Sequence, residues 1–298
     1  MIYTVTLNPS LDYVAFTDTF DFCKTNRTSN EYIVPGGKGL NVSILLSRLG
    51  TASAALGFSG GFTGDELEHL LQKEGINCDF VRVEDNTRIN VKLSSGGITE
   101  FNASGISLNC DKINTLKEKI KCLKSGDWLC LSGSIPKGAD TNIYKDLSQA
   151  APQGVKVVID AIGEPLKAAL CTEPFLIKPN RDELCDLFNA EIKTLKNIEA
   201  YAKKLKAMGA QNVLVSLGSD GALLLDKDGK THLQKAPNGK ALNTVASGDS
   251  MIAGFIHRYT ETADFADSLK FACSAGSATA FSKWIAEKEL VYQLFETL

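Results

Sequence analysis

Short apolar segments alternate with amphipathic segments along most of this chain. Five segments rich in β-branched and aromatic residues predict buried strands, at Ile2–Leu7, Trp128–Leu131, Val155–Ile159, Phe175–Ile177 and Val213–Leu217. Apolar residues spaced three and four apart predict helices between them, at Leu40–Leu49, Glu66–Lys73, Ile113–Leu123, Asp182–Phe188 and Ile198–Met208. This alternation predicts an α/β protein with a mainly parallel sheet covered by helices on both faces.

Two stretches break this rhythm. Val14–Val34 is polar and β-branched and has no helical period. Thr87–Gly105 predicts a hairpin whose strands, 88–93 and 98–101, are joined by a turn that contains Gly96-Gly97. Alternation places apolar residues on one face of the first strand and Arg88, Asn90 and Lys92 on the other. The polar face could close over an anion as a lid, or it could be an ordinary solvated surface.

The composition predicts one folded domain over residues 1–298, because 44% of the residues are hydrophobic and 22% are charged. A net charge of -3 argues against a nucleic-acid-binding protein. No apolar stretch is long enough to span a bilayer, so no membrane partner is expected, and the N-terminus lacks the pattern of a signal peptide. The eight cysteines form no C-x-x-C pair, which predicts reduced, buried thiols in the cytoplasm.

A glycine-rich loop, Pro35-Gly36-Gly37-Lys38-Gly39, precedes the first predicted helix. Glycines let the backbone approach a ligand closely, and the amides at a helix N-terminus can bind an anion. The spacing is not that of a Walker A loop. By itself the segment could equally be a connecting loop.

A second candidate is the segment 243–250, in which small residues lead into a helix that we expect to reach about Tyr259. Backbone amides at such a turn can stabilise charge on a transferring phosphoryl group, and the carboxylate of Asp249 could accept a proton from an attacking hydroxyl. Alternatively, Asp249 is an acidic residue that only stabilises the start of the helix.

Two further turns follow predicted strands. The turn at 216–221 could lie against a nucleotide or be a plain β-turn. In the segment 178–183, Asn180 and Glu183 have the spacing of a capping box. Their oxygens also suit a phosphate-bound Mg²⁺, directly or through water, and we expect both uses.

In order and spacing, these motifs resemble the PfkB branch of the ribokinase-like superfamily, over nearly the whole chain. The segments that carry the resemblance are 6–12, 36–41, 132–138, 178–183, 216–221 and 248–249. Among PfkB proteins the combination is most similar to kinases of ketohexose phosphates such as fructose 1-phosphate or tagatose 6-phosphate. The resemblance implies a Rossmann-like α/β/α core, a small β-lid formed by about 12–34 and 87–105, and ATP and Mg²⁺ as co-substrate and cofactor.

The resemblance also implies roles for individual residues. Asp249 would be the catalytic base, beside an anion hole formed by Ala246, Ser247 and Gly248. The sugar phosphate would be bound by Asp12, Gly36, Gly37, Lys38, Asn41, Arg88, Arg27, Lys92 and Ser134. The nucleotide would be bound by Lys178, Asn180, Ser216, Leu217, Gly218, Ser219, Asp220, Gly221 and Gly248, with Glu183 and Asn180 facing the metal. An exposed apolar face of the lid could pair two copies into a dimer.

The chain departs from the family pattern at the anion hole. The family favours D-T-x-G-A-G-D, whereas residues 243–249 read N-T-V-A-S-G-D. Ala246 replaces a glycine, and a Cβ atom penalises positive φ. We therefore expect a strained or displaced anion hole and at most a lowered rate. The alternative is a sugar-phosphate sensor that keeps the pocket and lacks the chemistry.

Overall fold

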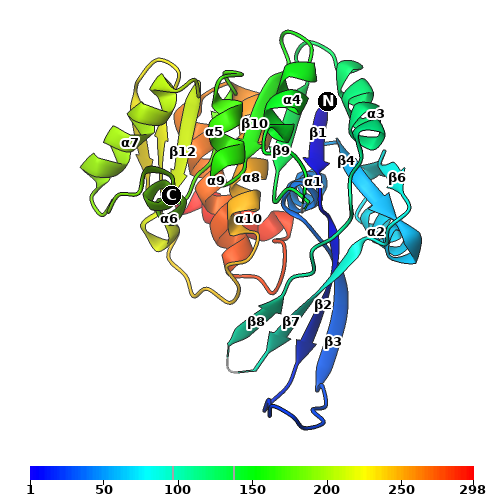
Figure 1. The fold of residues 1–298 in the computed structure, drawn as a ribbon. Helices are drawn as coiled ribbons and strands as arrows, with labels where there is room; N and C mark the ends of the chain where they lie inside the picture. The colour runs from blue at the N-terminus through cyan, green and yellow to red at the C-terminus, as the bar shows by residue number, and fades with distance from the viewer. Residues whose placement is uncertain (96, 137) are drawn as a thin grey trace.

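The computed structural model describes residues 1–95, 97–136 and 138–298. A twisted sheet of ten strands, parallel except at one edge, forms the centre of the molecule (Figure 1). Its strands lie in the order β14-β13-β12-β11-β10-β9-β1-β4-β5, with β6 paired to β4. The bounds are β1 Ile2–Thr6, β4 Ser53–Gly60, β5 Asn77–Cys78, β6 Val81–Val83, β9 Trp128–Ser132, β10 Lys156–Asp160, β11 Leu176–Ile177, β12 Asn212–Ser216, β13 Ala222–Leu225 and β14 Thr231–Gln234.

Helices cover both faces of this sheet and enclose two hydrophobic clusters. One cluster lies under α1 (Lys38–Arg48), α2 (Gly61–Lys73), α8 (Ser247–Thr262), α9 (Phe265–Ala280) and α10 (Lys288–Glu296). The other lies under α3 (Cys110–Lys121), α4 (Ile143–Ala150), α5 (Glu164–Leu170), α6 (Arg181–Phe188) and α7 (Leu195–Ala207). Strand β9 contributes Trp128 and Cys130 to the first cluster and Leu129 and Leu131 to the second. Burial on both faces explains why apolar residues occupy the centres of strands such as β9.

A second, four-stranded sheet projects from the carboxyl end of β1 (Figure 1). Its order is β3-β2-β7-β8, with bounds Asn30–Gly36, Ser10–Phe16, Arg88–Ser94 and Ile98–Phe101. Asp12 pairs with Asn90 across β2 and β7, so both side chains lie on one face. Ile33, Tyr13, Val91 and Phe101 form a row of cross-strand partners on the opposite face. The predicted hairpin and its two chemically different faces are therefore present.

The predicted α/β class and each of the ten predicted elements are confirmed, with ends shifted by a few residues. The pattern missed β4, whose sequence Ser-Ala-Ala-Leu-Gly-Phe-Ser-Gly has no β-branched residue although the strand is fully buried. It also missed α4, α5, α9 and α10. Gly96 of the predicted turn and Lys137 of the 132–138 motif lie outside the described residues.

All eight cysteines are free, but the expectation that they are buried is wrong for half of them. Cys130 and Cys273 are buried, whereas Cys23, Cys110, Cys122 and Cys171 are exposed. Among the described residues, no helix has the length and apolar character needed to cross a membrane.

Candidate active site

A cleft of about 1560 Å³ opens where the parallel strands end. Its floor is formed by residues that directly follow β1, β9, β10, β11 and β12, and the first turn of α8 closes one side. The polar face of the small sheet forms another wall. Open α/β sheets bind ligands at this carboxyl edge, because the connecting loops and helix N-termini converge there.

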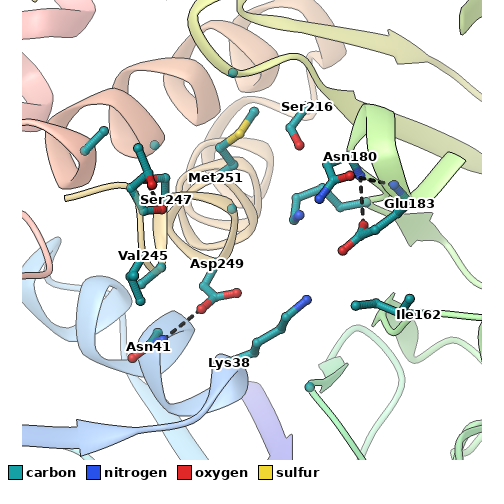
Figure 2. A pocket seen from close by; sticks show the side chains of 18 of the residues that line it. Lys38, Asn41, Ile162, Asn180, Glu183, Ser216, Val245, Ser247, Asp249 and Met251 are labelled. Atoms are coloured by element: carbon teal, nitrogen blue, oxygen red, sulfur yellow. Dashed lines mark hydrogen bonds between the residues drawn. The ribbon is translucent and has the colours of Figure 1, made fainter. Parts of the chain in front are cut away.

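Asp249 lies in the first turn of α8 and points into the cleft (Figure 2). It is buried, with 5% of its surface exposed, and its Oδ2 accepts a hydrogen bond of 2.8 Å from Nδ2 of Asn41. Burial, reinforced by the negative charge of Asp160, raises the pKa of Asp249 to about 7. Lys38, Asn41 and Lys178 act against this rise. A carboxyl group with a pKa near neutrality can accept a proton at physiological pH.

Two lysines approach the same space from different elements. Nζ of Lys38, at the start of α1, lies 3.1 Å from Oδ2 of Asp160. Nζ of Lys178, which follows β11, lies 3.6 Å from Oδ1 of the same carboxylate. Burial opposes the charge of Asp160, but the two ammonium groups hold its pKa below the usual range. Burial alone would lower the pKa of Lys38, yet the surrounding carboxylates, Asp160 first, raise it overall. Both lysines line the cleft.

The turn before α8 carries the residue that departs from the family pattern. Ala246 has φ 64° and ψ 1°, in the left-handed region. The first helical hydrogen bond is nevertheless formed, because Ser250 N donates to Ala246 O at 2.9 Å. A Cβ atom on Gly248 would lie 2.9 Å from Nζ of Lys178, so this ammonium group sits directly over the turn. Ala246 therefore has the positive φ that a Cβ atom penalises. The hydrogen bonding at the start of α8 is nevertheless regular.

The small sheet contributes an ordered polar network around Asp12. Its carboxylate accepts hydrogen bonds from Ser10 (2.7 Å) and Asn90 (3.0 Å), and it pairs with Nζ of Lys92 at 2.8 Å. Arg88 also lines the cleft, and its guanidinium donates to the carbonyl oxygens of Ala103 and Asn8, both at 2.9 Å. These contacts fix one carboxylate and two cations on the wall opposite Asp249.

Asn180 and Glu183 form the predicted capping box at the start of α6. Glu183 N donates to Oδ1 of Asn180 at 2.7 Å, and Asn180 N donates to Oε2 of Glu183 at 2.9 Å (Figure 2). Both residues also line the cleft. Within the described ranges, no group of three or more His, Cys, Asp or Glu side chains is arranged to hold a metal ion.

Nearly all the sequence-predicted residues line this one cleft, although they come from seven separate segments. Three do not. Arg27 lies in the exposed connection between β2 and β3, and Asp220 pairs with Arg181 at 2.8 Å. Gly36 lies just behind the wall, where a Cβ atom would be 2.4 Å from Oδ1 of Asp12.

Sequence reasoning missed two parts of the site. One is Asp160, whose only signal was its place at the end of a predicted strand. The other is a less polar end of the cleft, lined by the segment 236–241 and by Cys273, Gly276, Ala280 and Phe281 around α9. A Cβ atom on Gly276 would lie 2.5 Å from Cγ of Met251, so small residues let α9 pack closely beneath α8. The run of small residues in α9 was the available signal.

A buried carboxylate and two lysines, of which Lys178 is buried and Lys38 partly exposed, converge on a helix start. This arrangement is suited to phosphoryl transfer, which depends on positioning and charge stabilisation. Comparison with known proteins agrees. Residues 6–286 match the family described as pfkB family carbohydrate kinase, and the chain belongs to this family of sugar kinases.

The chain is 40% identical over 295 residues to a 1-phosphofructokinase of Bacillus subtilis, with 99% of this chain and 97% of that protein covered. It is 39% identical to a D-tagatose-1-phosphate kinase of Bacillus licheniformis, over 96% and 95% of the two chains. Among solved structures, a putative phosphofructokinase from Staphylococcus aureus superposes with a TM-score of 0.88 at 38% identity, over 99% and 97% of the two chains.

Proposed function

We propose that this kinase transfers the γ-phosphoryl group of ATP to the 6-hydroxyl of fructose 1-phosphate, giving fructose 1,6-bisphosphate and ADP. The observation that carries the proposal is the buried carboxylate of Asp249, which lies near Lys38 and Lys178 in a cleft whose wall also presents Arg88 and Lys92. The two similar relatives are named for kinases of ketohexose 1-phosphates, which supports a 1-phosphate as the acceptor.

Asp249 acts as the base. Its carboxylate takes the proton of the 6-hydroxyl, the hydroxyl oxygen attacks the γ-phosphorus, and the bond from that phosphorus to the β-γ bridging oxygen breaks. ADP leaves with the electron pair. Lys38 and Lys178 stabilise the negative charge on the transferring group, together with the amides of Gly248 and Asp249 in the first turn of α8, which have no partner within the helix.

The phosphate of the sugar lies against the small sheet, which we propose is the lid. Lys92 and Arg88 supply positive charge there, and Asp12 accepts hydrogen bonds from sugar hydroxyls. Gly37 at the start of α1 keeps the backbone close to the ligand, since it has φ 128° and a Cβ atom would meet Thr6 Cγ2 at 2.7 Å. The turn at Gly218–Asp220 and the less polar end of the cleft hold the nucleotide.

The donors at the start of α6 fit a magnesium ion carried by ATP. The capping box uses only one oxygen of Glu183, so the other oxygen remains available in the cleft. Mg²⁺ keeps several waters and needs only one or two carboxylates besides the phosphates of a nucleotide. Glu183, with Asn180 through water, would hold the ion, and the ion would neutralise charge on the phosphates.

The outer face of the lid supports a dimer. Ile33, Ile89 and Phe101 on this face expose 48%, 45% and 57% of their surface. A second copy of the chain would cover these apolar side chains. Light scattering after size-exclusion chromatography tests this, with a dimer expected for the wild type and a monomer for Phe101→Asp. A monomeric wild type would count against the dimer.

Initial rates over a panel of sugar phosphates with ATP and Mg²⁺ test the substrate. Fructose 1-phosphate should give the highest kcat/KM. Tagatose 6-phosphate is the alternative acceptor, and a clear preference for it would replace the proposed substrate. Binding of sugar phosphate without turnover of any acceptor would favour the sensor and overturn the catalytic proposal.

A further inference from the structure

A buried ion cluster lies behind the wall of the cleft and joins three elements of the core. Asp160 at the end of β10 is its centre, with 1% of its side chain exposed. It pairs with Lys38 from α1 and Lys178 from the segment after β11. Asp160 itself is not among the residues that line the cleft.

Both carboxylate oxygens of Asp160 are committed to these lysines. Neither oxygen has a conventional hydrogen bond from the described residues, so the two ammonium groups are its only polar partners there. A buried carboxylate of this kind is costly unless it is paired. The two lysines that pair with Asp160 also reach the cleft. Nζ of Lys178 lies over Gly248, and Lys38 lies beside Asp249 (Figure 2).

We propose that Asp160 is a positioning residue that holds Lys38 and Lys178 on either side of the transferring phosphoryl group and keeps the proton acceptor basic. Asp160 does this from behind the lysines, without touching substrate. The proposal rests on the proposed function, in which the two lysines bear on the phosphoryl group and Asp249 takes the proton.

The charges of the cluster explain how Asp160 can both position the two lysines and keep Asp249 basic. With Asp249 ionised, two lysine cations face two carboxylate anions, so the cluster is neutral. The charged groups acting on Asp249 are Asp160, Lys38 and Lys178, and Asn41 donates a hydrogen bond to it. Glu183 acts further out, on Lys38. Without the charge of Asp160, the two lysines would hold Asp249 as a weaker base and would no longer share an anchor.

Asp160→Asn keeps the size of the side chain and removes its charge. We expect kcat at saturating ATP, Mg²⁺ and sugar phosphate to fall at least about tenfold. We also expect the acid limb of kcat/KM to move down by about 1 pH unit, because a negative charge near Asp249 has been removed. Loss of packing alone would lower the rate without moving the limb in this direction.

A titration of Asp249 by carbon-13 carboxylate NMR gives a readout that does not depend on turnover. The titration midpoint of Asp249 should fall in Asp160→Asn, even if fructose 1-phosphate proves to be the wrong acceptor. Failure of the positioning role can therefore be told from failure of the proposed function. An unchanged midpoint in the folded variant would overturn the proposal.

Lys178→Met adds a double-mutant cycle. If Asp160 acts through this lysine, Lys178→Met should reduce kcat much less in the Asp160→Asn background than in the wild type. Additive effects of the two changes would contradict a shared role.

Asp226→Asn is the matched control. Asp226 is also buried at the end of a strand, β13, and pairs with His232 at 2.8 Å, but it does not line the cleft. Its neutralisation should leave kcat within about twofold of the wild type and the acid limb in place, as expected for a residue outside the reacting groups. A shift of the limb in this control would overturn the assignment to Asp160.

Two further outcomes decide the matter. Asp160→Asn with wild-type kcat, or with kcat restored by about tenfold more Mg²⁺, would overturn the positioning role, the latter in favour of a metal-binding one. If Asp160→Asn does not fold, Asp160→Glu keeps the charge and moves the carboxylate by one methylene. It should lower kcat without moving the acid limb, and wild-type kcat in that variant would refute the proposal.

Discussion

Ala246→Gly tests how much the alanine at the start of α8 lowers the free energy of unfolding. Ala246 has φ 64°, and the left-handed region costs a residue with a Cβ atom roughly 1–2 kcal/mol. Glycine removes that cost, but its greater conformational entropy stabilises the unfolded chain by about 0.4–1 kcal/mol. The partly buried methyl group also packs against the core. The net expectation is a gain of about 0.5 kcal/mol in the free energy of unfolding, or a rise in Tm of about 1–2 °C.

Ala263→Gly is a control on the same helix. Ala263 follows the last turn of α8 with φ 51°, is exposed, and lies about 26 Å along the helix axis from Ala246. It should gain at least as much stability, because no buried methyl group is lost. Calorimetry and steady-state kinetics on both variants are the assays.

We expect kcat of Ala246→Gly to stay within about twofold of the wild type, because the hydrogen bond from Ser250 N to Ala246 O already closes the first turn of α8. The backbone strain at Ala246 should therefore lower the free energy of unfolding and leave turnover nearly unchanged. A rise of about fivefold or more in kcat without a change in Tm would show that the methyl group displaces the turn. A lower Tm for Ala246→Gly beside a higher one for Ala263→Gly would refute the strain reasoning.

Three further results are expected. The acid limb of kcat/KM should lie near pH 7, because Asp249 must be ionised and its pKa is raised to about 7; a limb near pH 4 would contradict this. The pKa of Asp249 is higher in the folded state than in the unfolded chain, where it is about 3.9, so ionisation of Asp249 destabilises the fold as the pH rises above about 4. Asp249→Asn should therefore raise the free energy of unfolding by a few kcal/mol at pH above 7. Denaturant titrations should show this gain vanish below about pH 4. Lys92→Met should raise KM for the sugar phosphate at least about tenfold while KM for ATP changes less than about twofold; the control is Lys24→Met, which removes an exposed lysine that pairs with Asp21.

Strong local patterns made much of the fold predictable. β1 and β9 to β12 are short segments buried on both faces, and this burial leaves apolar or β-branched residues at their centres. β4 and α9 were missed because both are rich in Ala, Gly and Ser. These small residues allow close packing, but they do not produce a clear periodic pattern of large apolar side chains. The pattern therefore located the layers but not every element within them.

The site was predictable where a motif marks it and not where only tertiary structure does. Lys38 and Asp249 stand in recognisable segments, and Asn41 joins them through its hydrogen bond to Asp249. The place of Asp160 at the end of a predicted strand does not mark it as functional, because its importance comes from two lysines that are distant in the sequence. The resemblance assigned Arg27 to the sugar phosphate as a residue of the lid, whereas Arg27 lies in the exposed connection between β2 and β3.

The most direct test of the account is the release of ADP from ATP and Mg²⁺ with fructose 1-phosphate, compared between the wild type and Asp249→Asn. Turnover in the variant should fall by about two to four orders of magnitude while its circular dichroism spectrum is unchanged. Near-normal turnover in a folded Asp249→Asn variant would contradict the assignment of Asp249 as the proton acceptor and the mechanism built on it.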